Sequence, residues 1–80
     1  MKNFQELVKE ELERARQMFE PQHSHHESAA VIKEEYDEYW DWVKLNPSER
    51  DRIKMLRELV QIAAMAQRAA EDNGLIELGS

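Results

Sequence analysis

The chain has no cysteine and only two glycines and two prolines among its 80 residues. Without thiolates, any metal it binds must be held by oxygen or nitrogen atoms, and disulfides are excluded. No apolar run approaches the roughly 20 residues that span a bilayer, and residues 1–6 hold no signal-peptide core. There is also no phosphate-cradling glycine loop. We therefore expect one domain, residues 1–80, in the cytoplasm and away from membranes.

The charge balance is acidic, with a formal net charge of −6. Nucleic-acid binders usually carry the opposite charge, so direct nucleic-acid binding is not expected. An acidic protein can still bind phosphates when a divalent cation stands between the two negative groups. A chain this short also buries too little surface to be very stable alone, which favours self-association or metal binding.

Apolar residues recur at the helical period, which predicts an all-α fold with helices at about 3–19, 25–44 and 47–72. The expected boundary signals are Pro21, a capping box at Ser24-His25-His26-Glu27, an Asn46-Pro47-Ser48-Glu49 start and an Asn73-Gly74 stop. The second helix is expected to present a core stripe of Ala29, Ile32, Tyr36, Tyr39 and Val43. The tail, residues 75–80, is expected to be loosely held.

The second and third helices are separated by about three residues in this prediction, and short links make antiparallel neighbours. The third helix is apolar around much of its circumference, so it should be covered on more than one side. Three short helices cannot easily do this, and we infer a second copy of the chain. The predicted architecture is a three-helix antiparallel hairpin that assembles into a homodimeric helical bundle.

An acidic cluster occupies the middle of the second helix. Glu34 and Glu38 are one turn apart on one stripe, and Glu35 lies beside them, nearer the core. Like charges at this spacing repel each other, and partial exclusion of water raises the cost unless a cation compensates. Carboxylate oxygens are the ligands that Mg²⁺ prefers. The cluster is therefore a candidate site for Mg²⁺, although acid-rich helices are often simply solvated.

A metal site would need a partner on the third helix, and Glu58 is the acid nearest its apolar surface. Counted from the turn, Glu35 is roughly 14 Å along one helix and Glu58 roughly 17 Å along the other. The two residues should therefore be nearly level. Gln61 and Asp72 lie on the same stripe as Glu58.

Residues 26–40 resemble the second helix of MazG-like proteins, the all-α nucleoside triphosphate pyrophosphohydrolases. The motif of that family is E-E-x-x-E on one helix followed by E-x-x-D on the next. Glu34-Glu35-x-x-Glu38 completes the first half, and Glu58-Leu59-Val60-Gln61 gives the second with Gln61 in place of Asp. Residues 62–68 are also similar to small bacterial and phage members, so the resemblance covers about residues 24–72.

The resemblance implies a homodimer in which the glutamates hold Mg²⁺, with Mn²⁺ as an alternative, against a nucleoside triphosphate. A metal-activated water would release pyrophosphate and a nucleoside monophosphate. The expected catalytic residues are Glu34, Glu35, Glu38 and Glu58, and the expected metal ligands are Glu35, Glu38, Glu58 and Gln61. Lys54, Arg57 and Trp42 are the candidates for substrate binding. Because the Gln61 amide carries no charge, metal affinity and activity should be weakened.

Two other functions remain open from the sequence. The chain fits a non-catalytic interaction module, such as a small phage-type acidic inhibitor or adaptor that binds another protein through its apolar and acidic surface. It also fits a structural oligomer with no ligand. Metal binding separates these from the enzyme, because neither needs a cation.

Overall fold

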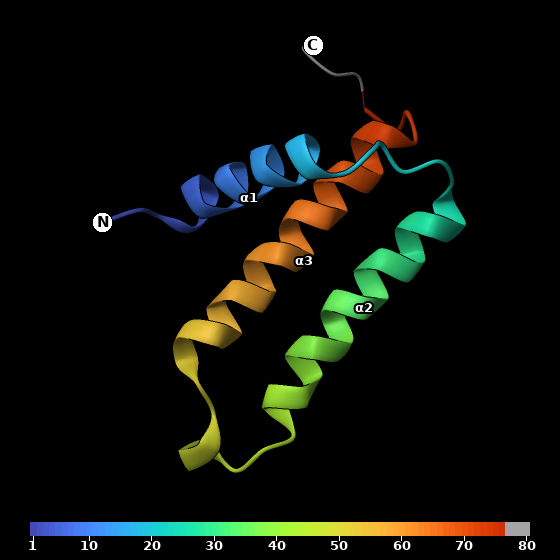
Figure 1. Ribbon diagram of the computed structural model, residues 1–80. Coiled ribbons are helices and arrows are strands. Elements are labelled where there is room, and N and C mark those ends of the chain that lie inside the picture. Colours follow the sequence, from blue (N-terminus) through green and yellow to red (C-terminus); the bar gives the residue numbers. More distant parts are fainter. Residues whose placement is uncertain (77–80) are drawn as a thin grey trace.

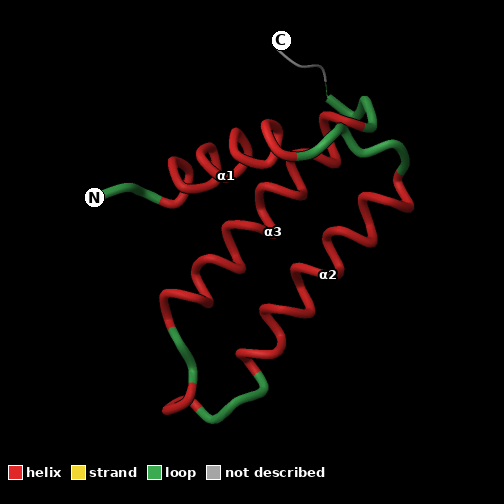
Figure 2. The backbone as a smooth tube through the Cα atoms, viewed as in Figure 1, coloured by secondary structure: helices red, strands yellow, loops and turns green. Residues whose placement is uncertain are grey.

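The computed structural model describes residues 1–76, which form three α-helices, one short 3-10 turn and no strand (Figures 1 and 2). The elements are α1 (Phe4–Met18), α2 (His25–Val43), η1 (Pro47–Glu49) and α3 (Arg52–Asp72). Helices α2 and α3 run antiparallel side by side, and α1 crosses α3 (Figure 1). The predicted all-α, three-helix hairpin is confirmed, whereas the expectation for residues 77–80 lies outside the described part.

Capping side chains fix where the helices begin. Asn3 Oδ1 accepts from Glu6 N–H at 2.8 Å, and Ser24 Oγ accepts from Glu27 N–H at 3.0 Å. The cap predicted at Ser24 is therefore confirmed. Among the described residues, none of the helices is long and apolar enough to cross a membrane.

The predicted start of the third helix at Pro47 is wrong. Pro47–Glu49 makes only the turn η1, because the Asn46 side chain caps no backbone N–H there. The chain is extended again at Arg50, and Asp51 then caps α3 by accepting from the N–H groups of residues 53 and 54 at 3.0 and 3.1 Å. The connection therefore spans residues 44–51, not the short link predicted.

The inward face of α2 is more polar than its apolar pattern suggested. Tyr36, expected in the core, is 52% exposed, and Ala29 is exposed as well. The face that packs on α3 instead contains Ser28, which is 3% exposed, and the half-buried Glu35. Ile32, Tyr39 and Val43 of the predicted stripe are half-buried, and Glu35 was expected near the core, so Ser28 is the buried position that the apolar pattern did not indicate.

The apolar core is small. Ala15, Ala64 and Met65 are buried together, packed against partly buried Val8, Leu12, Val31 and Ile32. The chain exposes 6055 Å², whereas a folded monomer of its mass exposes about 5,000 Å². Its radius of gyration is 13.7 Å, against about 12 Å for a compact chain of this length. The hairpin with α1 across it is therefore an open arrangement.

A buried ion network, here called the Asp72 latch, joins the α1–α2 connection to the end of α3. Asp72, whose side chain is 3% exposed, accepts from Arg16 Nη1 at 3.1 Å and from the Gln22 backbone N–H at 2.9 Å. Arg68 lies beside Asp72 and donates to the Glu20 carbonyl oxygen at 2.9 Å. Although burial opposes ionisation, the bond from Gln22 and the charge of Arg16 keep the pKa of Asp72 below its usual value.

Replacing Asp72 by Asn should destabilise the fold by about 3 kcal/mol, because the buried Arg68 loses its carboxylate partner, whereas Arg16 keeps its ion pair with Glu71. Urea unfolding followed by circular dichroism measures the loss. The matched control is Asp37→Asn, since Asp37 pairs only with exposed Lys33 and should change stability by less than about 1 kcal/mol. Equal effects of the two substitutions would contradict the role assigned to the latch.

Candidate metal centre

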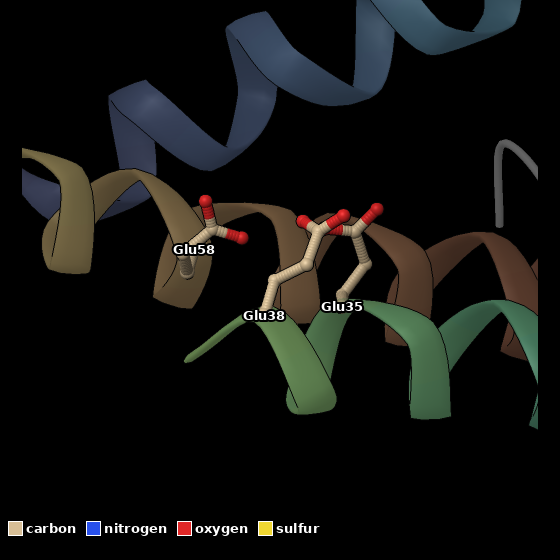
Figure 3. Close-up of side chains that lie close together, drawn as sticks. All are labelled: Glu35, Glu38 and Glu58. Atoms are coloured by element: carbon tan, nitrogen blue, oxygen red, sulfur yellow. The ribbon is translucent and has the colours of Figure 1, made fainter. Parts of the chain in front are cut away.

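Three carboxylates from two helices converge on one point between α2 and α3. Glu35 and Glu38 rise from adjacent turns of α2, and Glu58 reaches toward them from α3 (Figure 3). One oxygen of each residue lies within 4.8 Å of the oxygens of the other two. The expectation that Glu35 and Glu58 are level is therefore confirmed, despite the longer connection between the helices.

Two of these carboxylates are held in positions that disfavour their charge. Glu35 and Glu58 are half-buried, and the Oε2 atom of each is buried without a hydrogen-bond partner among the described residues. Burial, and then the neighbouring Glu38 carboxylate, raises the pKa of Glu35 to about 7. The same two causes raise the pKa of Glu58 to about 7, against a smaller opposing effect of Arg57. The protein thus brings together acids that repel each other.

The donor set fits a hard divalent cation. All three side chains offer oxygen, the ligand type that Mg²⁺ and Mn²⁺ take, and two of them have an oxygen with no other partner. A cation would offset the burial and repulsion that raise both pKa values. Glu38 is exposed, so the cluster is open to solvent on the side where water or a phosphate would complete the coordination.

The structure describes the surroundings of the other residues predicted from the sequence. Gln61 is half-buried one turn after Glu58 and lines a groove between α1 and α3 together with Arg57. Lys54 lies over the ring of Trp42, with Nζ 5.6 Å from the ring centroid. Along α3, Lys54 lies about one turn before Glu58 and Gln61 about one turn after it.

Two further acids singled out from the sequence, Glu34 and Asp72, lie outside the three-carboxylate cluster. Glu34 is exposed and does not belong to the three-carboxylate cluster, although it lines a groove next to Glu35. Asp72, on the same stripe as Glu58 in the sequence, is held by Arg16 and Gln22 in the latch. Its carboxylate is therefore already neutralised by protein groups.

Helix α1 contributes charges that the sequence analysis did not connect with the site. Arg14 bonds Glu11 through Nε at 2.9 Å. That bond, with a smaller contribution from the charge of Glu35, raises the pKa of Arg14. The only local signal is the i, i+3 spacing of Glu11 and Arg14, which is common on solvated helices. Their proximity to α2 depends on how α1 crosses α3.

No protein-family model, curated protein or solved structure matches the chain. A functional assignment therefore starts from the three carboxylates and from the motif that places them on facing helices. The two observations concern the same residues, since Glu35 and Glu38 belong to the E-E-x-x-E pattern and Glu58 opens the pattern on the next helix.

The raised pKa values of Glu35 and Glu58 predict that stability depends on pH. Both carboxyls bind protons more tightly in the folded chain, so stability is lost as pH rises from about 4.5 to about 7. Without divalent cations, the melting temperature at pH 8 should be lower than at pH 5.5 by on the order of 5 °C. Mg²⁺ should restore it at pH 8 and change it little at pH 5.5.

Scanning calorimetry at fixed protein concentration makes this measurement. The control is the double variant Glu35→Gln, Glu58→Gln, which removes both titrating groups and should show neither the decline nor the response to Mg²⁺. A decline of equal size in the double variant would assign the pH dependence to other residues.

Proposed function

We propose that the chain is a divalent-cation-dependent nucleoside triphosphate pyrophosphohydrolase of the MazG-like type. The observation that supports this most directly is the convergence of Glu35, Glu38 and Glu58, with an unpartnered oxygen on two of them. Acids held together at a cost in stability are typical of functional sites. The E-E-x-x-E pattern and the following Glu58 supply the link to triphosphate chemistry.

The residues of the chain have separate tasks in this proposal. Glu35, Glu38 and Glu58 would hold Mg²⁺ or Mn²⁺, which supplies positive charge against the triphosphate and makes a water more acidic. Lys54 and Arg57 are exposed near the Glu58 end of the cluster and offer positive charge to the phosphates. Gln61 offers a neutral amide oxygen where the related motif has a carboxylate, so cation binding should be weak.

The variant Glu38→Gln should reduce pyrophosphate release from nucleoside triphosphates by roughly 100-fold, because it removes a charged ligand without changing the size of the side chain. The assay uses a panel of triphosphates with Mg²⁺, and the control is Glu13→Gln on the exposed surface of α1. In the same assay, Gln61→Asp should increase both Mg²⁺ affinity and the rate. If calorimetry detects no binding of a divalent cation to the wild-type chain, the proposed enzymatic activity is refuted.

We also propose that two copies of the chain associate through the face of the hairpin opposite the acidic cluster. At 100° per residue, Tyr36 and Trp40 lie on the flank of α2 opposite Glu38, and Leu59 on the flank of α3 opposite Gln61. These three apolar side chains are 52%, 48% and 38% exposed. The chain exposes about 1,000 Å² more surface than a folded monomer of its mass is expected to expose. This difference is similar to the roughly 800 Å² that each partner buries in a standard interface.

The substitution Leu59→Glu should shift this dimer to monomers, because it places a charge on the apolar face. Analytical ultracentrifugation should give twice the chain mass of 9.5 kDa for the wild type and the single mass for the variant. Gln17→Glu, on the exposed surface of α1, is the charge-matched control. A wild type that is monomeric at all concentrations would contradict the proposal.

A further inference from the structure

A lysine and a tryptophan form a pair next to the three carboxylates. Lys54 Nζ lies 5.6 Å from the centroid of the Trp42 ring, within the roughly 6 Å over which a ring face attracts an ammonium group. Trp42 follows Glu38 by four residues on α2, and Lys54 precedes Glu58 by four residues on the antiparallel α3 (Figure 1). The pair is therefore about one helical turn away from the carboxylates of Glu38 and Glu58, on the side of the 44–51 connection.

The Lys54 ammonium does not pair with the acid that follows it by one turn. Residues four apart on a helix are neighbours, so a lysine at this spacing can reach the acid. Lys33 and Asp37 have the same order and spacing on α2, and they form an ion pair at 2.8 Å. Lys54 forms no ion pair with Glu58 in the described part of the chain, and Glu58 Oε2 is buried without a hydrogen-bond partner there. Lys54 contacts the Trp42 ring instead.

The position of this lysine decides what the neighbouring carboxylates can bind. An ammonium group paired with Glu58 would occupy an oxygen that a divalent cation needs as a ligand. With Lys54 on the ring, the oxygens of Glu38 and Glu58 stay available to a cation. The ammonium also keeps its donor protons for an anion that lies beside the cation, because an aromatic ring face takes up none of them in a conventional hydrogen bond.

We infer that Trp42 is a positioning residue, which holds the Lys54 ammonium beside the three-carboxylate cluster and keeps it from pairing with Glu58. The inference rests on the proposed cation site at Glu35, Glu38 and Glu58. From the ring, the lysine meets the phosphates of a cation-bound triphosphate without displacing the cation. Trp42 touches neither the cation nor the phosphates in this role and acts through Lys54.

Calorimetric titration of the full chain with Mn²⁺ alone tests the inference without any substrate. Trp42→Leu should weaken Mn²⁺ binding by roughly fivefold, because the released Lys54 then pairs with Glu58. Trp42→Phe keeps a ring face and should bind Mn²⁺ like the wild type. In a chain that carries Lys54→Met, adding Trp42→Leu should change Mn²⁺ affinity by less than about twofold, whereas a loss of packing would weaken binding in that chain too. Lys9→Met, on the exposed surface of α1, is the charge-matched control in which Trp42→Leu should keep its full effect.

A second measurement on the wild type keeps the inference testable if Trp42→Leu does not fold. The ring current of an aromatic side chain shifts protons above its face upfield in the NMR spectrum. The Hε resonances of Lys54 should therefore lie upfield of those of Lys33, which is paired with Asp37, and Trp42→Phe should reduce the difference. Equal positions of the two lysines in the wild type would overturn the inference.

The outcomes separate this inference from the proposed enzyme. Equal Mn²⁺ affinities of the wild type and Trp42→Leu, or a loss that persists together with Lys54→Met, would overturn the positioning role and leave the proposed activity standing. Mn²⁺ binding that depends on Trp42 only when Lys54 is present, without pyrophosphate release from any triphosphate, would support the positioning role and contradict the enzyme. A wild-type chain that binds no Mn²⁺ would overturn both.

Discussion

The buried carboxylate of Asp72 is the interaction on which the arrangement of the helices depends. It accepts from Arg16 near the end of α1 and from Gln22 in the connection to α2, and it lies beside Arg68 on its own helix. Asn73 adds a bond to Ser28 at the start of α2, at 2.8 Å. Three segments distant in the sequence are thereby fixed at one end of the hairpin. With so few buried apolar side chains, this polar junction takes over much of the positioning that a larger core would provide.

The Asp72 latch also determines the surroundings of the acidic cluster. Because α1 is fixed to the end of α3, it crosses α3 and brings Arg14 close enough to interact with Glu35. The connection that carries Phe19 and Gln22 forms one wall of the groove next to Glu35. The cluster and the groove share Glu35, and the α1–α2 connection lines the groove on one side.

The inward face of α2 shows how the chain accepts a loss of stability in favour of a defined polar site. Glu35 is half-buried, and burial together with the neighbouring Glu38 carboxylate raises its pKa to about 7, so its surroundings disfavour the charged form. Glu58 meets it from α3 with the same shift. Local violations of the packing rules are expected where a sequence serves function rather than stability, which is the physical basis of the proposed cation site.

The three helices, their order along the chain and the acids that face each other follow from local patterns in the amino-acid sequence. The capping residue Ser24 and the i, i+3 spacing of Glu35 and Glu38 are local features, so the helical period was sufficient to place them. Two predictions from the sequence were wrong. The helix start signal at Pro47 gives only a 3-10 turn, and Tyr36 is exposed although its position in the apolar pattern predicted burial. Three further arrangements depend on how the helices pack: Asp72 pairs with arginine and not with the cluster, Arg14 of α1 interacts with Glu35, and Phe19, Glu34 and Arg68 line one groove. These arrangements depend on the crossing of α1 over α3, and no pattern within a single helix encodes that crossing.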